Sequence, residues 1–371
     1  MNFFTLGTEI RMDDTQKRLI HVDEEITRET ESLFQKIRST LATFPPRKQL
    51  YGVDFELQFA QVCGSVYAIS TFTSSVLRHV LQSMNLSEGD EVICPAWLRS
   101  TYIRSVLATK LVPVFSEITP YTLGLDFRDV SMKLSPRTKV ILLVHSCGIP
   151  ADLEAFTTLC KEKNLKLIEI VPCGLGSTYR QKVLGTFGTA GIIEYHPQHS
   201  YSDQDACILL TDTETVARRV RSMSFYEHTL GTFSELQGAL GLWDISNQAG
   251  TAKLRKDAAY RFDRAFEKVY GISIFHEHTI SQWGHQKYPI RVSAKIRDEL
   301  LEHLLAKGFK AAAPRKPANL HSYIQTRLRP AQLLITEKLV REIILLPTSL
   351  SKDDQDSLIE TIQAYFQNLP L

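Results

Sequence analysis

Short apolar segments alternate with amphipathic segments along the first two thirds of the chain, and this alternation limits the fold more than any other feature. The apolar segments have the length of strands and are apolar on both faces, and helical patterns near 74–86, 100–109 and 152–163 lie between several of them. Strands that are buried on both faces and connected by helices form mainly parallel sheets. The sequence therefore predicts the α/β class, with strands at Asp90–Pro95, Leu111–Phe115, Lys139–His145, Lys166–Ile170, Ala190–Tyr195 and Ala206–Thr211.

The pattern changes after Ser234. A long helix is expected over about 233–269, and it is followed by a strand near Lys287–Val292 and by helices near 294–307 and 352–367. This order predicts a smaller α+β domain after the sheet domain. We therefore expect an amino-terminal helical segment, a large α/β domain and a small carboxyl-terminal α+β domain, at 1–48, 49–250 and 251–371.

The composition limits the partners that the chain can have. A chain of 371 residues with 43% hydrophobic content can bury a large core. With 43 basic and 41 acidic residues, the net charge of +2 predicts neither a nucleic acid nor a membrane partner. The six cysteines are scattered without a CxxC pair, which suits buried free thiols in a reducing cytoplasm. No signal peptide or apolar run of spanning length is visible, so a cytoplasmic location is expected.

Polar side chains follow the strand expected at Ala190–Tyr195. The stretch GIIEYHPQH places Glu194 within that strand and His196 and His199 just after it. In parallel α/β sheets, ligands bind at the carboxyl ends of the strands. The sequence therefore predicts a binding site at this strand end.

Several segments, in this order and spacing, resemble those of the DegT-type (DegT/StrS) sugar aminotransferases over about residues 50–350. The matching segments are Glu88–Pro95, Ser135–Lys139 with Val144 and His145, Gly148–Asp152, Gly185–Gly188, Ser234–Leu242 and Leu346–Ser351. Enzymes of this family act on nucleotide-linked sugars with pyridoxal phosphate. The resemblance implies their fold, which is a fold-type I, aspartate-aminotransferase-like three-layer domain with a smaller second domain.

The resemblance also assigns positions in the cofactor site, and most of them have changed here. The lysine that forms the Schiff base corresponds to His199, and the carboxylate that protonates the pyridine ring corresponds to Ile170. An imidazole cannot form the Schiff base, and isoleucine cannot hold the ring proton. The serine that contacts the cofactor phosphate corresponds to Glu194, which would repel a phosphate.

Other positions of the family's site are less clearly lost. The stacking aromatic ring corresponds to Arg99, although Trp97 lies two residues away. The hydroxyls of Thr73, Ser74 and Ser75 are retained where the family binds phosphate at a helix amino terminus. Cys173 lies near the former site and, without a neighbouring base, is expected to be inert. We expect Glu194 to be paired with Arg99, with His199 or with one of these hydroxyls.

Three hypotheses about function follow. The favoured one is a family member that cannot form the Schiff base and has no cofactor, and that binds a nucleotide sugar or a catalytic paralogue. The second is a dehydratase-like enzyme that uses His199 as a base with pyridoxamine phosphate. The third is an ordinary pyridoxal-phosphate aminotransferase, which requires a different register. In each case the resemblance implies a homodimer.

Two further clusters are expected to be solvated surface. His276, His278 and His285 have donor types that bind metals, but they lie on a polar strand edge, and no metal site is predicted. Arg218–Arg221 is expected to form the solvated face of a helix.

Overall fold

The computed structural model describes Gln35 and residues 51–72, 76–172, 175–195, 206–226, 234–277, 279–328 and 331–369. The chain divides into two units, Met1–Gln49 and Leu50–Leu371. The helices and strands described below all belong to the second unit.

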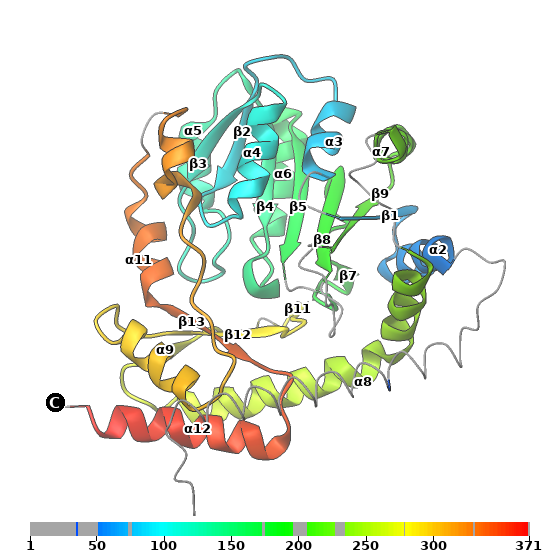
Figure 1. The fold of residues 1–371 in the computed structure, drawn as a ribbon. Coiled ribbons are helices and arrows are strands. Elements are labelled where there is room, and N and C mark those ends of the chain that lie inside the picture. Colours follow the sequence, from blue (N-terminus) through cyan, green and yellow to red (C-terminus); the bar gives the residue numbers. More distant parts are fainter. Residues whose placement is uncertain are drawn as a thin grey trace, which may run out of the picture. The chain divides into compact units, whose positions relative to one another are not determined.

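A seven-stranded, mainly parallel sheet forms the centre of this unit (Figure 1). Its strands are β1 (Tyr67–Phe72), β2 (Glu91–Pro95), β3 (Val112–Ser116), β4 (Thr138–Val144), β5 (Lys166–Pro172), β8 (Ala190–Tyr195) and β9 (Ala206–Thr211). Their order in the sheet is β1-β9-β8-β5-β4-β2-β3, and β9 is antiparallel to both of its neighbours. Because β8, β5, β4, β2 and β3 are parallel, their carboxyl ends meet at one edge of the sheet.

Helices cover both faces of this sheet. One face packs against α3 (Val76–Ser83), α4 (Ser100–Ala108) and α7 (Glu214–Tyr226), and these contacts form the largest described core. On the other face, Tyr195 packs against Phe55 and Phe59 of α2 (Tyr51–Cys63). Its hydroxyl lies 2.8 Å from a carboxylate oxygen of Asp244 in α8 (Glu235–Phe266). The connecting helices α5 and α6 span Phe127–Lys133 and Leu153–Lys163.

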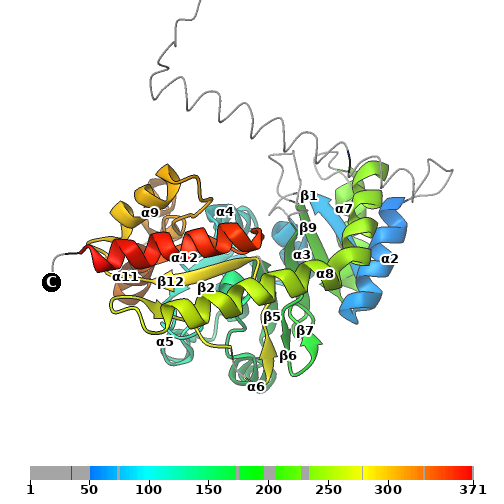
Figure 2. The ribbon, with the colours of Figure 1, turned by 90° about the horizontal axis from the view of Figure 1, so that it is seen from below.

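A smaller domain forms around a second sheet with the order β10-β12-β13. The long helix α8 runs from beside α2 to beside α12 and so joins the two domains (Figures 1 and 2). The small domain contains β10 (Ser273–Ile274), β12 (Lys287–Arg291), β13 (Ile343–Pro347), α9 (Arg297–Ala306), α11 (Leu334–Glu342) and α12 (Lys352–Gln367). The remaining elements are short: β6 (Thr178–Tyr179), β7 (Lys182–Val183), β11 (Ser281–Gln282), α10 (Ser322–Gln325) and the 3₁₀ turns Ser146–Gly148 and Ala318–Leu320.

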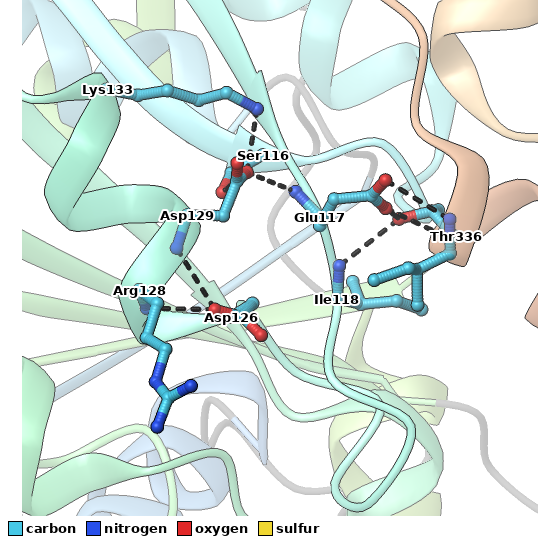
Figure 3. Close-up of polar contacts among 9 residues, drawn as sticks. Ser116, Glu117, Ile118, Asp126, Arg128, Asp129, Lys133 and Thr336 are labelled. Carbon is cyan, nitrogen blue, oxygen red and sulfur yellow. Dashed lines mark hydrogen bonds and ion pairs between the residues drawn. The ribbon is translucent and has the colours of Figure 1, made fainter.

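Glu117, directly after β3, anchors α11 to the large domain (Figure 3). Its carboxylate accepts the backbone N–H groups of Ile335 and Thr336 at 3.1 and 2.8 Å and the Thr336 hydroxyl at 2.6 Å. The Thr336 hydroxyl in turn accepts the N–H of Ile118 at 3.2 Å. Leu333, at the N-cap of α11, has no side chain that could serve as a cap. The Glu117 carboxylate therefore accepts hydrogen bonds from N–H groups in the first turn of α11, and its negative charge stabilises the positive end of the helix dipole.

We predict that Glu117→Ala lowers the free energy of unfolding by about 1–3 kcal/mol, because two N–H groups at the start of α11 and the buried Thr336 hydroxyl lose their acceptor. Urea unfolding followed by circular dichroism measures the change. Glu88→Ala is the matched control, since Glu88 forms only an exposed ion pair with Lys110 at 2.9 Å, and its loss should stay within about 0.5 kcal/mol. Equal stability of the two variants would contradict the anchoring role of Glu117.

The structure confirms the α/β class and the six expected strands of the large domain, which are β2, β3, β4, β5, β8 and β9. It also confirms the long helix, observed as Glu235–Phe266. The strand β1 and the helix α2 were not expected from the sequence. The boundary expected near residue 250 falls inside α8, and the division into 1–48, 49–250 and 251–371 stays a prediction.

The cysteines of the described residues behave as expected. Cys63, Cys94, Cys147, Cys160 and Cys207 are buried and form no disulfide bond. Burial raises the pKa of the Cys63 thiol to about 12, which keeps it protonated and unreactive at neutral pH. Among the described helices, none combines the length and the apolar character that a membrane span requires.

Candidate functional site

The carboxyl ends of β2, β4, β5 and β8 border a cavity of about 250 Å³ that residues of the small domain close from the opposite side. Figure 1 shows the ends of β5 and β8 pointing towards β12 and β13. The sheet side of the cavity is lined by Trp97, Arg99, Val144, Cys147 and Glu194, among others. The small-domain side includes Lys287, Arg315 and Leu345. The cavity thus lies at the edge of the sheet where the sequence predicts a site.

A buried carboxylate in β5, Glu169, connects the neighbouring strands near this edge of the sheet. Glu169 is fully buried, and its carboxylate accepts the backbone N–H groups of Gly185, Phe187 and Gly188 at 2.6–2.9 Å. It also lies 3.1 Å from Nε2 of His145, at the end of β4. One carboxylate therefore fixes β4, β5 and the turn that leads into β8.

The partners of His145 determine which of its ring nitrogens carries the proton. Its Nδ1 accepts the backbone N–H of Ala151 at 3.0 Å. Because Nδ1 must then be unprotonated, the proton lies on Nε2, which donates to Glu169. The imidazole has no further position for a ligand, and its role is structural.

We predict that Glu169→Gln lowers the free energy of unfolding by about 3–5 kcal/mol, because a buried hydrogen-bonded charge is removed and its donors stay in place. The amide can accept only on its oxygen, so its NH₂ group would face either the Phe187 and Gly188 amides or the Gly185 amide and His145. Urea unfolding measures the loss. Glu162→Gln, an exposed change in α6, is the control, and a loss no larger than that of Glu162→Gln would contradict this role.

Ile170, the next residue of β5, faces the opposite side of the sheet because side chains alternate along a strand. It lies beside Val144 of β4 and Ile192 of β8 in the parallel register. The side chain is fully buried and packs in the apolar core together with both of these neighbours. It shares its face with Pro172 and Glu194, which form the next residue pair towards the strand ends.

Three polar groups meet near this row, on the side of α4. Glu194 is 5% exposed and lines the cavity together with Arg99, the N-cap residue of α4. Burial raises the pKa of the Tyr102 hydroxyl, the Glu194 carboxylate raises it further, and the Arg99 guanidinium opposes the rise. The Glu194 carboxylate and the Arg99 guanidinium therefore lie close to the Tyr102 phenol. The Tyr102 hydroxyl forms no hydrogen bond within the described part of the chain.

This arrangement agrees with the expectation that Glu194 is paired. Neither Glu194 nor Arg99 is without an interaction partner. Tyr102 stays protonated at neutral pH, so it can offer its proton to the carboxylate. A buried carboxylate and a guanidinium thus line the sheet side of the cavity, and the fully buried Tyr102 phenol lies close to both.

Other predicted site residues lie outside the described residues. These are Thr73, Ser74, Ser75, Cys173, His196 and His199. Of the site residues expected from the sequence, the structure therefore describes Arg99, Ile170 and Glu194, and it brings Arg99 and Glu194 to one cavity. Trp97, the alternative to Arg99 as the stacking residue, lines the same cavity.

The sequence analysis missed three residues of this site. Tyr102 lies one helical turn after Arg99, and this spacing could have indicated that it shares the site. Lys287 and Arg315 reach the cavity from the small domain. No local pattern connects them to residues that lie far earlier in the chain.

The expectation that His285 lies on a solvated edge was wrong. His285 is 6% exposed, and burial lowers the pKa of its imidazole to about 4, so the ring is neutral at physiological pH. The buried Trp283 ring packs against it, with 5.7 Å between the ring centroids. His278 lies outside the described residues, and the described part of the chain contains no cluster of metal-ligand side chains.

The expectation for Arg218–Arg221 is confirmed in part. Arg218 and Arg219 are exposed on α7. Arg221 forms an ion pair with Glu56 at 2.8 Å, and Glu56 also accepts from the backbone and the hydroxyl of Ser70. Arg221 therefore joins α7 to α2 and β1.

The sequence of residues 29–363 matches the model of the DegT/DnrJ/EryC1/StrS aminotransferase family. The chain belongs to this family. The spore coat polysaccharide biosynthesis protein SpsC of Bacillus subtilis (strain 168) is 25% identical in an alignment over 342 residues that covers 83% of this chain and 88% of SpsC. A dTDP-4-dehydro-2,3,6-trideoxy-D-glucose 4-aminotransferase of Saccharopolyspora spinosa is 23% identical over 369 residues, covering 92% of this chain and 94% of that enzyme.

Solved structures of the DegT/StrS family share the fold. S. venezuelae DesV, in complex with a ketimine intermediate, matches with a TM-score of 0.81 at 22% identity, over 93% of this chain and 98% of DesV. The agreement confirms the fold-type I, aspartate-aminotransferase-like architecture that the resemblance implied.

DegT/StrS enzymes depend on pyridoxal or pyridoxamine phosphate, so the described residues can be tested against that cofactor. At the position of the ring carboxylate, Ile170 is fully buried in the apolar core. At the position of the phosphate serine, Glu194 places a carboxylate in the cavity. At the two positions that the resemblance assigns to the ring nitrogen and to the phosphate serine, the described side chains thus offer an apolar group and a carboxylate.

Proposed function

We propose that this DegT/StrS family protein binds a nucleotide-linked sugar in the cavity without forming a Schiff base to pyridoxal phosphate. The observation that carries the proposal is the replacement of both cofactor contacts on one face of the sheet, by Ile170 and by Glu194. The fold that positions the site is retained, because Glu169 still holds β4, β5 and the turn before β8.

Electrostatics support the loss of the phosphate contact. Two like unit charges about 4 Å apart repel by about 4 kcal/mol at the effective dielectric constant of a protein surface. A phosphate dianion beside Glu194 would feel this repulsion for each of its charges, and the site is partly shielded from water. Arg99 can compensate only one charge, and Glu194 already lies beside it.

At the position that the resemblance assigns to the ring carboxylate, Ile170 would offer the cofactor ring no hydrogen-bond partner. A protonated pyridine nitrogen next to Ile170 would bury a charge without a partner, which is strongly unfavourable. The dehydratase-like alternative, with His199 as a base and pyridoxamine phosphate as cofactor, meets the same difficulty because it uses the same ring. The same electrostatic argument therefore counts against this alternative.

We predict that the purified protein, incubated with pyridoxal phosphate, shows no absorption band of an internal aldimine and no borohydride-stable adduct by mass spectrometry. The sequence carries histidine at the lysine position, His199, and the ring partner is Ile170. A thermal-shift series with nucleotide sugars such as UDP-glucose should raise the melting temperature with ligand concentration. A cofactor adduct on any lysine of the cavity would refute the proposal, as would a melting temperature that no nucleotide sugar changes.

We further propose that the protein is a homodimer in which a second copy covers the outer surface of α2 and the start of α8. Apolar side chains are exposed there: Val53 is 46%, Leu57 65% and Leu236 44% exposed. Val53 and Leu57 are one helical turn apart and lie on the same side of α2. Exposed apolar side chains that lie together are typical of interfaces.

We predict that the wild-type protein sediments as a dimer at micromolar concentration and that Leu57→Asp shifts it towards monomer, because a carboxylate would be buried at the interface. Met132→Asp, which changes another exposed apolar residue, should leave the dimer intact. A wild-type protein that sediments as a monomer would rule out the homodimer.

A further inference from the structure

Two cationic side chains line the small-domain side of the cavity and have no anionic partner. Lys287 begins β12, and Arg315 lies in the segment that follows α9. Within the described residues, neither side chain takes part in an ion pair or a hydrogen bond. The neighbouring Arg291, in contrast, pairs with Glu342 at 2.7 Å.

The remaining charges of the cavity do not neutralise these two cations. Among the described lining residues, Glu194 is the sole carboxylate, and it lies with Arg99 near Tyr102. If the charges of Glu194 and Arg99 offset each other, Lys287 and Arg315 leave two positive charges. Lys287 is half-buried and Arg315 is exposed, so an anion that binds between them is attracted by both charges, and salt partly screens this attraction. The cavity is therefore complementary to a ligand with two negative charges.

The backbone segments that carry both cations are fixed before a ligand binds. Ala312 and Leu345 exchange two backbone hydrogen bonds of 2.9 and 2.8 Å, which fasten the segment of Arg315 to β13. Lys287 lies opposite Pro347 in the register of β12 with β13. The N–H of Ala318 donates to the carbonyl of Ala96 at 2.8 Å, which fastens the same segment to the end of β2. Little ordering of the backbone is then needed on binding.

The types of the two cations and the size of the cavity indicate the class of ligand. A guanidinium can bind two phosphate oxygens at once, and an ammonium supplies a compact charge beside it. A volume of about 250 Å³ is smaller than the ~300–1,000 Å³ typical of sites that enclose a drug-sized ligand. The cavity can therefore enclose the phosphates and a neighbouring sugar, while a nucleoside would lie outside it.

We propose that Lys287 and Arg315 bind the doubly charged diphosphate of the ligand, from the wall of the cavity that faces the sheet. This inference rests on the proposed function and specifies which part of the nucleotide-linked sugar the small domain recognises. Lys287 of β12 and Arg315 of the segment after α9 supply the contact to the diphosphate. On the sheet side, the Glu194 carboxylate offsets the positive charge of Arg99.

Calorimetric titration of the full chain with inorganic diphosphate, UDP-glucose and glucose tests the proposal. Diphosphate and UDP-glucose should both bind, and glucose alone should not. Lys287→Met and Arg315→Gln should each weaken the binding of diphosphate by about 10- to 100-fold, the usual effect of losing one hydrogen bond to a charged group. Arg315→Lys should recover part of the loss, because it retains the charge without the bidentate geometry.

Arg218→Gln is the matched control, since Arg218 is an exposed cation on α7 that does not line this cavity. It should leave the binding of diphosphate within about twofold of the wild type. Circular dichroism melts of every variant separate a loss of binding from a loss of folding. Failure of the wild-type protein to bind millimolar diphosphate would overturn the inference, as would folded Lys287→Met and Arg315→Gln variants with wild-type affinity.

The two proposals fail in different ways. A cofactor adduct on a lysine would refute the proposed function. Diphosphate binding by the wild type and by the Lys287 and Arg315 variants would still test this inference separately. Binding of UDP-glucose that is insensitive to both substitutions would refute this inference and leave the proposed function intact.

Discussion

The buried carboxylate of Glu169 is the interaction on which the arrangement of the site depends. It accepts three backbone N–H groups and the Nε2–H of His145, and its donors come from the end of β4 and from the turn before β8. Removing any one of these donors, or the carboxylate itself, would leave buried polar groups without partners. Because the carboxyl ends of β4, β5 and β8 border the cavity, this network sets the positions of the residues that line it.

Neighbouring residues of β5 point to opposite faces of the sheet and make different contacts. Glu169 faces the turn before β8 and accepts its N–H groups, whereas Ile170, one residue later, packs in the apolar core on the opposite face of the sheet. The next row contains Pro172 and Glu194, and it brings a carboxylate to the position of a phosphate contact. The side chains that hold the fold here are thus different from those that line the cavity, and a fold alone does not determine the chemistry of its site.

Sequence patterns located the strands of the parallel sheet well, because residues buried on both faces leave a continuous apolar signal. The edge strand β1, Tyr67–Phe72, carries Ser70 and Thr71 and gives no such signal. Register within the family's motifs correctly brought Arg99 and Glu194 to one cavity. Family motifs could not identify Lys287 and Arg315 as site residues, because tertiary contacts between distant segments place them at the cavity. These contacts involve α8, α11 and the hydrogen bond from Thr336 to Glu117.

A crystal structure of the protein soaked with both pyridoxal phosphate and UDP-glucose tests the central claim most directly. The account predicts that the diphosphate of the nucleotide sugar lies between Lys287 and Arg315, with no pyridine ring above Ile170 and with the Glu194 carboxylate still beside Arg99. A pyridine ring stacked in the cavity with its nitrogen towards Ile170 and its phosphate beside Glu194 would contradict it.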